Sequence, residues 1–287
     1  MLRNKGENMS YKIVSDSSAD LLNSEGTAFS SVPLKIITDS KEYIDDASLD
    51  VDGMIEDLKK YKGESKSSCP NIDDWSSSFD DYDNIICVTI TSGLSGSNNT
   101  ASLALNEHLE AHPEKHGFVI DTLSTGPENA LIIEKLQELI SSKLDIDEIK
   151  AKINEYKNKT HLIFSLDSLR NLANNGRVNP AVAKIAGVLG IRIIGKASNE
   201  GTLEITNKVR GYEKSLSQIF KNLKESGYTG GKLRIHHCQN LKAAQALCET
   251  VKHEFKNAII IIQETRALCS FYAESGGLLV GFEGAAK

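Results

Sequence analysis

Short apolar runs alternate along the chain with longer stretches in which apolar residues return at helical spacing. Ile85–Ile90 is the clearest apolar run and predicts a buried strand, while Val51–Lys60 and Pro127–Ser142 have the spacing of amphipathic helices. Strands that alternate with helices are typical of a mostly parallel sheet covered on both faces. The first half of the chain therefore predicts an α/β domain.

The same pattern predicts further elements in this half. Strands are expected at Lys12–Val14, Ser31–Ile37 and Gly117–Ile120, helices at Ile72–Phe79, Asn98–His112 and Ile146–Asn158, a turn into a helix at Ser15–Leu22 and a polar loop at Ser65–Asn71. Thr38–Tyr43 is expected to form a turn and a hairpin return. The turn at Ser15–Leu22 carries Ser and Asp, residues that cap helix N-termini.

A polar link at Lys157–Thr160 precedes a second half with more antiparallel character. Strands are expected at His161–Ser165, Ile191–Ile194, Leu203–Thr206, Lys232–His236, Ala258–Glu264 and Leu278–Phe282, helices at Ser168–Asn174, Pro180–Leu189, Tyr212–Glu225 and Leu241–Phe255, and a short connector at Cys269–Glu274. We predict two α/β domains, residues 1–159 with a mostly parallel sheet and residues 160–287 with a mixed sheet. Residues 1–9 are expected to be a disordered extension.

Four turns of the predicted first domain are rich in Ser, Thr, Asp or Gly. They are Ser15–Ser18, Ser67–Asn71, Thr91–Ser97 and Asp121–Gly126. In sheets of this kind ligands gather beyond the carboxyl ends of the strands, so the turns could share one site. The same residues are also favoured as helix N-caps, and the pattern leaves both interpretations open.

The turn Thr91–Ser97 joins an apolar strand directly to a helix. Its glycines and hydroxyls present free backbone N–H groups and O–H groups to one place, which favours an anion such as a phosphate or a carboxylate. The sequence has neither Gly-x-x-x-x-Gly-Lys-Ser/Thr nor Gly-x-Gly-x-x-Gly, so a nucleotide site is disfavoured.

Composition narrows the classes of partner. The chain has 287 residues and a net charge of −6, which argues against binding nucleic acid through phosphate contacts. No stretch of about 18 apolar residues is present, so no membrane anchor is expected, and the first residues lack the apolar core of a secretory signal. Cys69, Cys87, Cys238, Cys248 and Cys269 are odd in number, and no pair has Cys-x-x-Cys spacing. Free thiols and a cytoplasmic location are expected.

Metal and cofactor chemistry is not expected. His236-His237-Cys238 places three possible zinc ligands side by side, but no second cluster has the spacing of a zinc site. The simpler interpretation is that these residues end a strand. Ser95 as the nucleophile of a hydrolase would need a positioned base, and only His236 and His237 could approach it.

A carboxylate site without chemistry is the third interpretation. Hydroxyls of Ser95 and of the Ser67–Ser68 loop, together with Arg177 on a glycine turn, can hold a carboxylate through charge-assisted hydrogen bonds. Pro180–Gly190 follows, with small apolar side chains that could line a slot or simply pack closely.

Many of these segments match a known family in order and spacing. The chain resembles the DegV family of bacterial fatty-acid-binding proteins over nearly its whole length. The matching segments are Ile13–Leu21, Val32–Leu34, Tyr43–Asp46, Lys66–Asn71, Ser92–Ser97, Ile120–Thr122 with Ser124 and Gly126, Gly176–Arg177, Lys208–Gly211 and the terminal Gly-rich strand.

The resemblance implies that a fatty acid lies between the two domains, with its acyl chain in an apolar tunnel largely within the second. On matching positions the carboxylate would meet Ser67 and Ser95, and the family's arginine falls on Arg177. The ligand-binding residues expected on this basis are Ser67, Ser68, Ser95, Gly96, Ser97, Arg177 and Tyr272.

Two segments depart from the family pattern. Tyr272 stands where relatives have a His followed by a Gly-Pro-Gly-like turn, and Glu274 brings a carboxylate near the site, where it would oppose a bound carboxylate if it pointed inward. Cys69 stands where Gln is usual.

The expected function is that of a non-catalytic, cytoplasmic carrier that binds a long-chain fatty acid and presents it to a separate fatty acid kinase for acyl phosphate formation. The alternative is a serine-dependent enzyme that acts on a small acyl or phosphoryl substrate.

Overall fold

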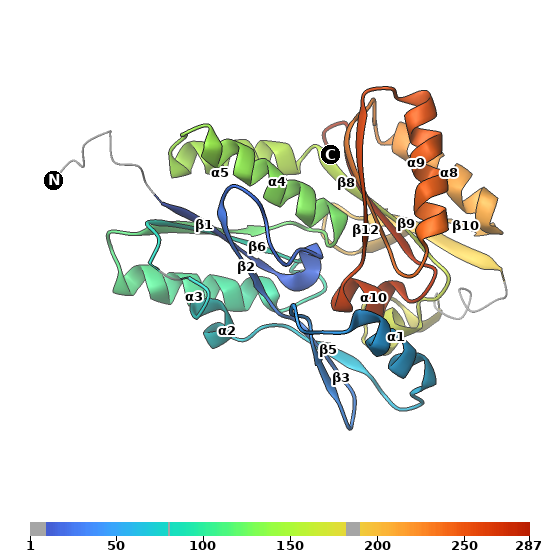
Figure 1. The fold of residues 1–287 in the computed structure, drawn as a ribbon, viewed down its shortest axis with the longest axis horizontal. Helices are drawn as coiled ribbons and strands as arrows, with labels where there is room; N and C mark the ends of the chain where they lie inside the picture. Colours follow the sequence, from blue (N-terminus) through green and yellow to red (C-terminus); the bar gives the residue numbers. More distant parts are fainter. Residues whose placement is uncertain (1–9, 80, 182–189) are drawn as a thin grey trace.

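The first sheet has four parallel strands in the order β2-β1-β6-β7 (Figure 1). Its strands are β1 (Tyr11–Asp16), β2 (Ala28–Val32), β6 (Asn84–Thr89) and β7 (His116–Asp121), and its helices are α2 (Ile72–Ser76), α3 (Ser97–Ala111), α4 (Pro127–Ser141) and α5 (Ile146–Lys157). The computed structural model describes residues 10–79, 81–181 and 190–287.

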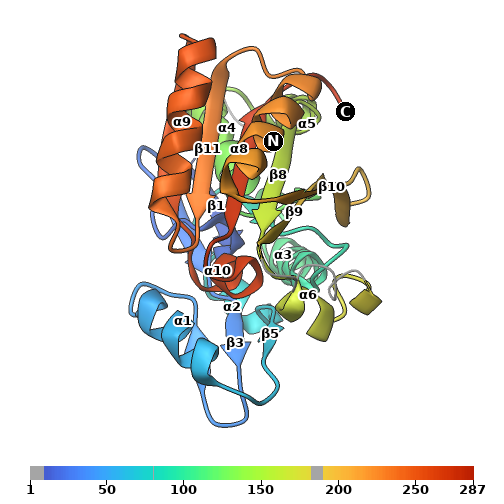
Figure 2. The same cartoon turned by 90° about the vertical axis from the view of Figure 1, so that its right-hand side faces the viewer.

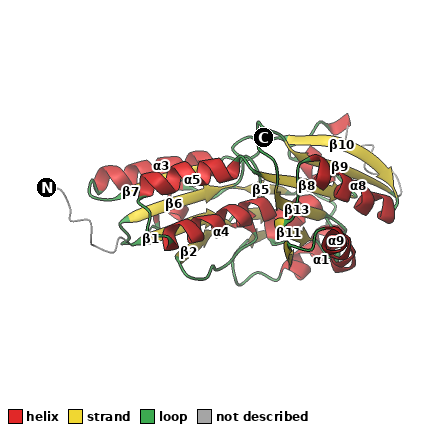
Figure 3. Ribbon diagram, turned by 90° about the horizontal axis from the view of Figure 1, so that it is seen from above, coloured by secondary structure: helices red, strands yellow, loops and turns green. Residues whose placement is uncertain are grey.

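Helices cover both faces of this sheet because its strands are apolar on both sides. One face, with Ile13 and Ile86, packs against α4 and α5, and the other, with Val14 and Cys87, packs against α2 and α3. Figure 1 shows α4 and α5 above the strands and α3 below them, and Figure 3 gives the view from above. The predicted parallel sheet with helices on both faces is therefore confirmed.

A small antiparallel sheet, in the order β4-β3-β5, extends from the first. It contains β3 (Lys35–Ile37), β4 (Glu42–Ile44) and β5 (Lys66–Ser68), and α1 (Val51–Lys60) lies between β4 and β5 in the chain. The predicted single strand at Ser31–Ile37 is thus wrong, because the chain leaves the parallel sheet at Pro33, which has no N–H to donate. The loop predicted at Ser65–Asn71 contains β5.

The helix expected after the first strand is also absent. A single 3₁₀ turn, η1 (Ser17–Ala19), follows β1, and Asp20 ends it with a left-handed φ of 60°. The Ser17 hydroxyl accepts the N–H of Leu34 at 3.0 Å, so the hydroxyl-rich residues of this turn are engaged in long-range bonds.

The second half of the chain forms a six-stranded mixed sheet in the order β10-β9-β8-β13-β11-β12. It contains β8 (Thr160–Leu166), β9 (Ile191–Ala197), β10 (Leu203–Arg210), β11 (Gly231–His237), β12 (Ala258–Glu264) and β13 (Leu278–Glu283), with α6 (Arg170–Asn174), α8 (Tyr212–Glu225), α9 (Leu241–Glu254) and α10 (Ala267–Ala273). Among the described residues of this sheet, β11 and β12 run parallel and the other neighbouring strands pair antiparallel, so the predicted mixed sheet is confirmed.

The two faces of this sheet have different neighbours. The outer face packs against α8 and α9, which Figure 2 shows side by side. The inner face, with Leu162, Phe164 and Leu279, packs against α10 and against apolar residues of the first half such as Leu34 and Ile90. The fold is a two-domain α/β fold, and the predicted boundary after residue 159 stays a prediction.

Two further expectations need comment. The connector predicted at Cys269–Glu274 is wrong, since α10 is a helix whose residues are buried except for Tyr272, which is partly buried. The helix predicted at Pro180–Leu189 lies almost entirely outside the described residues, as does the extension at 1–9. Within the described residues, no helix combines the length and the apolar character that a membrane span requires.

Candidate functional site

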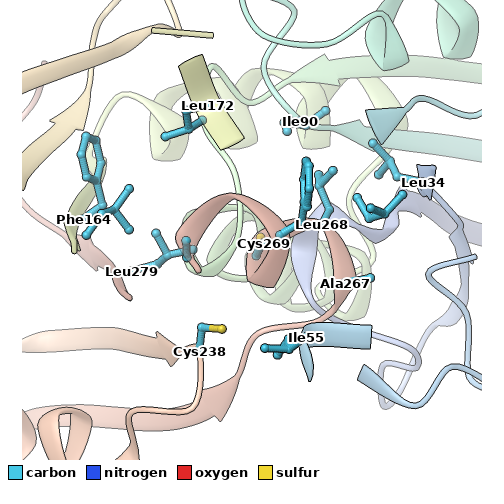
Figure 4. Close-up of a cluster of buried hydrophobic side chains, with 14 of the residues drawn as sticks. Leu34, Ile55, Ile90, Phe164, Leu172, Cys238, Ala267, Leu268, Cys269 and Leu279 are labelled. Carbon is cyan, nitrogen blue, oxygen red and sulfur yellow. The ribbon is translucent and has the colours of Figure 1, made fainter. Parts of the chain in front are cut away.

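A cavity of about 290 Å³ is lined by residues from both halves of the chain. Its apolar walls are formed by Leu34, Ile90, Leu94, Leu162, Phe164, Leu166, Leu172, Leu203, Leu268, Cys269, Ala273 and Leu279. Figure 4 shows several of them around α10, with Leu34 and Ile90 on one side and Phe164 and Leu279 on the other. A void of about 10–15 Å³ suffices for one water, so this cavity has room for an extended apolar molecule.

Two of the polar residues of the wall are hydrogen-bonded to each other. The Ser67 Oγ and the Tyr272 hydroxyl oxygen lie 2.6 Å apart, and Ser68, Ser95 and Arg177 also line the cavity. A largely apolar cavity with a few convergent polar groups is typical of a ligand site in which those groups fix one end of the ligand.

Arg177 is placed by a glycine turn and held by backbone carbonyls. Gly176 has a φ of 73°, which glycine adopts freely, and the Arg177 N–H then donates to the Leu172 carbonyl at 2.8 Å. The guanidinium donates from Nε to the Leu94 carbonyl at 3.1 Å and from Nη1 to the Asn175 carbonyl. Guanidinium has five N–H donors, so these bonds leave others for an anion.

Tyr272 supplies a neutral donor at the same place. Burial raises the pKa of Tyr272, and the Ser67 hydrogen bond and the positive charge of Arg177 partly offset this effect. The phenol therefore stays protonated at neutral pH, and its O–H can donate to an anion. Arg177 is the only cationic side chain among the described residues that line the cavity.

The glycine loop before α3 is fixed against the second half of the chain. Thr91 donates from Oγ1 to the Gly201 carbonyl at 2.8 Å, and a Cβ at Gly201 would lie 2.1 Å from that Oγ1. Gly96 caps α3 without a side-chain hydrogen bond and lines the cavity, so the positive end of the helix dipole borders it.

Asp16 connects the predicted turns behind this loop. Its fully buried carboxylate accepts from Ser97 Oγ at 2.6 Å, from the Ile90 N–H at 2.9 Å and from Ser18. Burial raises the pKa of Asp16, and these hydrogen bonds lower it. The predicted role of Ser97 as a ligand contact does not agree with this arrangement, because its hydroxyl is buried against Asp16 and Ser97 does not line the cavity.

The turns are brought together as expected from parallel strands. Gly126 donates its N–H to the Ser18 carbonyl at 2.8 Å, and Thr91 donates its N–H to the Ser124 carbonyl at 2.9 Å. Three of the four hydroxyl-rich turns therefore meet at one edge of the first sheet, and the fourth contributes Ser67 and Ser68 to the cavity from β5.

Helix α10, which carries four cavity-lining residues, is held at its N-terminus by a residue far away in the chain. Asp45 accepts from the N–H groups of Ala267 and Leu268 at 3.1 and 3.2 Å and lies 3.2 Å from Nε of Arg266. Burial raises the pKa of Asp45 to about 6, while these three groups lower it and Asp20 adds to the rise.

This carboxylate predicts a pH-dependent stability. Since folded Asp45 keeps its proton to higher pH than the unfolded chain, its stabilising contribution is full below about pH 4 and is lost as the pH rises through about 6. We expect the difference in unfolding free energy between the natural protein and Asp45→Asn to fall by about 2 kcal/mol between pH 4 and pH 7. Urea unfolding at both pH values measures it, and a difference that does not change with pH would contradict it.

The structure brings six of the seven predicted site residues to the cavity wall. These are Ser67, Ser68, Ser95, Gly96, Arg177 and Tyr272. Sequence reasoning missed Thr125, Leu172 and, on α10, Leu268, Cys269 and Ala273 as cavity residues. The alternation of Leu162, Phe164 and Leu166 on β8 was the available signal for the wall, but the same alternation indicates an ordinary core strand.

Glu274 does not oppose a bound anion. Its carboxylate accepts from Ser168 Oγ at 2.8 Å and lines a separate groove between α1 and α6. His236 cannot serve Ser95 as a base, because its side chain is fully buried, with Nδ1 2.8 Å from the Asp20 carboxylate, and does not line the cavity.

The cavity offers little for acid–base chemistry. Among the described residues that line it there is no His, Asp or Glu, and the Ser95 hydroxyl accepts the N–H of Ser97 at 3.3 Å. A nucleophilic serine requires an adjacent base, so the alternative of a serine-dependent enzyme is not supported. Within the described residues, no group of three or more His, Cys, Asp or Glu could hold a metal ion, and the five cysteines are free thiols.

Fold and site together define a two-domain α/β protein with an internal, largely apolar cavity and a cationic side chain among its few polar groups. The model of the DegV family, described as an uncharacterised protein family, matches residues 10–283. The chain belongs to the DegV family, as its sequence motifs indicated.

Relatives match along nearly their whole length. A DegV domain-containing protein of Streptococcus gordonii is 44% identical over 279 residues, which cover 96% of this chain and 99% of the relative. A DegV family protein from Eubacterium eligens, solved loaded with heptadecanoic acid, has 43% identity and a TM-score of 0.94. The fatty acid kinase (Fak) B3 protein of Streptococcus pneumoniae, solved loaded with linoleic acid, has 43% identity and a TM-score of 0.95. Each structural match covers 96% of this chain and 100% of the other.

Proposed function

We propose that this protein binds one long-chain fatty acid, with the acyl chain in the cavity and the carboxylate at Ser67, Ser95, Arg177 and Tyr272. The observation that carries the proposal is the apolar cavity whose polar groups include a guanidinium and a partly buried hydroxyl pair. The loaded structures of the Eubacterium eligens and Streptococcus pneumoniae relatives support it, because they share this fold at 43% identity.

The two ends of such a ligand need different surroundings. Burying an ionised carboxylate costs several kcal/mol unless it is hydrogen-bonded and paired, which the Arg177 guanidinium and the hydroxyls of Ser67 and Tyr272 would provide. Each methylene buried against the apolar walls contributes about 0.8 kcal/mol. The acyl chain would therefore supply most of the affinity, and the polar groups would fix its orientation.

We further propose that the protein is a non-catalytic, cytoplasmic carrier that presents the bound carboxyl group to a separate fatty acid kinase. The likeness to a protein that carries the name fatty acid kinase B3 supports this role. The lack of an acid or base among the described lining residues is in accord with chemistry performed by a partner.

The direct test is to identify what the purified protein contains. Native mass spectrometry is expected to show one bound molecule per chain, with the mass of a fatty acid after extraction, since the cavity excludes water from an aliphatic chain. Addition of a purified fatty acid kinase and ATP is then expected to yield an acyl phosphate only when the carrier is present. A protein that neither retains nor takes up heptadecanoic acid or linoleic acid, the ligands of the two relatives, would contradict the proposal.

A further inference from the structure

Glu274 has a backbone conformation that side-chain-bearing residues rarely adopt. It follows α10 directly, two residues after Tyr272, with a φ of 52° and a ψ of 169°. This part of conformational space is close to one that only glycine enters freely, and a residue held there stores strain. Strain of this kind persists only where surrounding contacts maintain it.

The side chain of Glu274 makes those contacts with the start of α6. Its Oε1 accepts from Ser168 Oγ at 2.8 Å and from the Asn171 N–H at 3.4 Å, and Oε2 lies 3.6 Å from Nη2 of Arg170. The carboxylate is one-fifth exposed and faces away from the cavity. Glu274 therefore ties the end of α10 to α6 without touching the space for the ligand.

Helix α6 in turn connects the segments that carry the polar groups of the cavity. Asn171 donates from Nδ2 to the Phe271 carbonyl at 2.8 Å, next to Tyr272, and Asn175 donates from Nδ2 to the Ser65 carbonyl at 3.1 Å, two residues before Ser67. The chain then reaches Arg177, whose guanidinium holds the Leu94 carbonyl beside Ser95.

We propose that Glu274 is a positioning residue for the head group of the ligand, acting through α6 on Tyr272, Ser67 and Arg177. The inference rests on the proposed function and adds a residue outside the cavity to it. The contacts of the carboxylate maintain a strained backbone, so the protein gives up stability at residue 274 to fix the end of α10. Stability and ligand binding should then respond differently to changes at this position.

A pair of substitutions separates the two effects. Glu274→Ala and Glu274→Gly both remove the carboxylate contacts, but only glycine relaxes the backbone, so Glu274→Gly is expected to have the higher Tm. Both variants are expected to bind heptadecanoic acid about fivefold or more weakly, because the loss of the tie is the same. Glu274→Gln keeps an acceptor oxygen for Ser168 and Asn171 and is expected to restore most of the affinity.

The readouts are the Tm, the dissociation constant and the ¹³C chemical shift of carboxyl-labelled heptadecanoic acid, which reports the hydrogen bonds at the head group. Lys143→Gly is the matched control. Lys143 also has a positive φ, of 57°, but it is exposed in the turn between α4 and α5, so its replacement is expected to raise the Tm and leave binding unchanged.

The outcomes distinguish the two levels of the proposal. Unchanged affinity and an unchanged carboxyl shift in Glu274→Ala and Glu274→Gly overturn the positioning role alone. If the glycine variant binds the fatty acid better than the alanine variant, in the same order as their Tm values, Glu274 has only a structural role. That result also overturns the positioning role. If the unsubstituted protein does not bind heptadecanoic acid, the proposed function is wrong and the inference falls with it.

Discussion

Arg177→Ala is expected to weaken the binding of a long-chain fatty acid about 10-fold to 100-fold, because a hydrogen bond to a charged group contributes about 1.5–3 kcal/mol. No other cation lines the described part of the cavity, so the carboxylate would be left with hydroxyl and N–H donors only. The substitution also frees the Leu94 carbonyl, which loosens the loop that carries Ser95. Isothermal calorimetry with heptadecanoic acid measures the change.

Two control variants make this result specific. Arg177→Lys keeps the charge but not the forked geometry and is expected to fall between the natural protein and the alanine variant. Arg210→Ala removes an exposed arginine that does not line the cavity and is expected to bind normally. Equal affinity in the natural protein and Arg177→Ala would show that the carboxylate lies elsewhere.

Leu203→Trp is expected to reduce binding on the order of 100-fold, since an indole in the cavity would displace about four methylenes, each contributing about 0.8 kcal/mol. Leu203 lines the cavity from β10, an edge strand of the six-stranded sheet, and is only partly buried. The larger side chain can therefore enter the empty space at little cost to folding. Lipid extraction followed by mass spectrometry would show the purified variant without its ligand.

The neighbouring residue provides the control for this substitution. Glu204 lies on the same strand and is exposed, so Glu204→Trp adds the same side chain outside the cavity and is expected to retain the fatty acid. Short fatty acids are expected to bind Leu203→Trp almost as well as the natural protein, because they do not reach the filled part. Full retention of long chains in Leu203→Trp would mean that the acyl chain does not occupy this cavity.

The sequence was sufficient where an element is long and periodic. α1, α8 and β12 have the bounds that their patterns predict, since the apolar residues of the helices repeat over several turns and those of β12 form one continuous run. Short elements were missed for a physical reason. The N–H groups at the start of α10 are satisfied by Asp45, more than 200 residues earlier, and β5 exists only because it pairs with β3.

The polar residues of the candidate site were easier to predict from the sequence than the apolar ones. Hydroxyl-rich turns and an arginine after Asn175-Gly176 are unusual enough to attract notice, and the structure brings Ser67, Ser95 and Arg177 to one cavity. Leu162 and Leu279, in contrast, are of the same residue type and lie at the same spacing as core residues that contact only other side chains of the protein. The role of each polar residue toward a ligand stays a prediction until the substitutions above are measured.

The cavity walls belong to the same apolar cluster that joins the two domains. A bound aliphatic chain would therefore pack as part of the core between the domains. A molecule that binds only the folded chain stabilises it, and the more so the further its free concentration exceeds the dissociation constant. Protein without bound lipid would unfold more often, and be degraded sooner, than protein with bound lipid. The cellular abundance of this protein would then follow the supply of its lipid without any change in transcription.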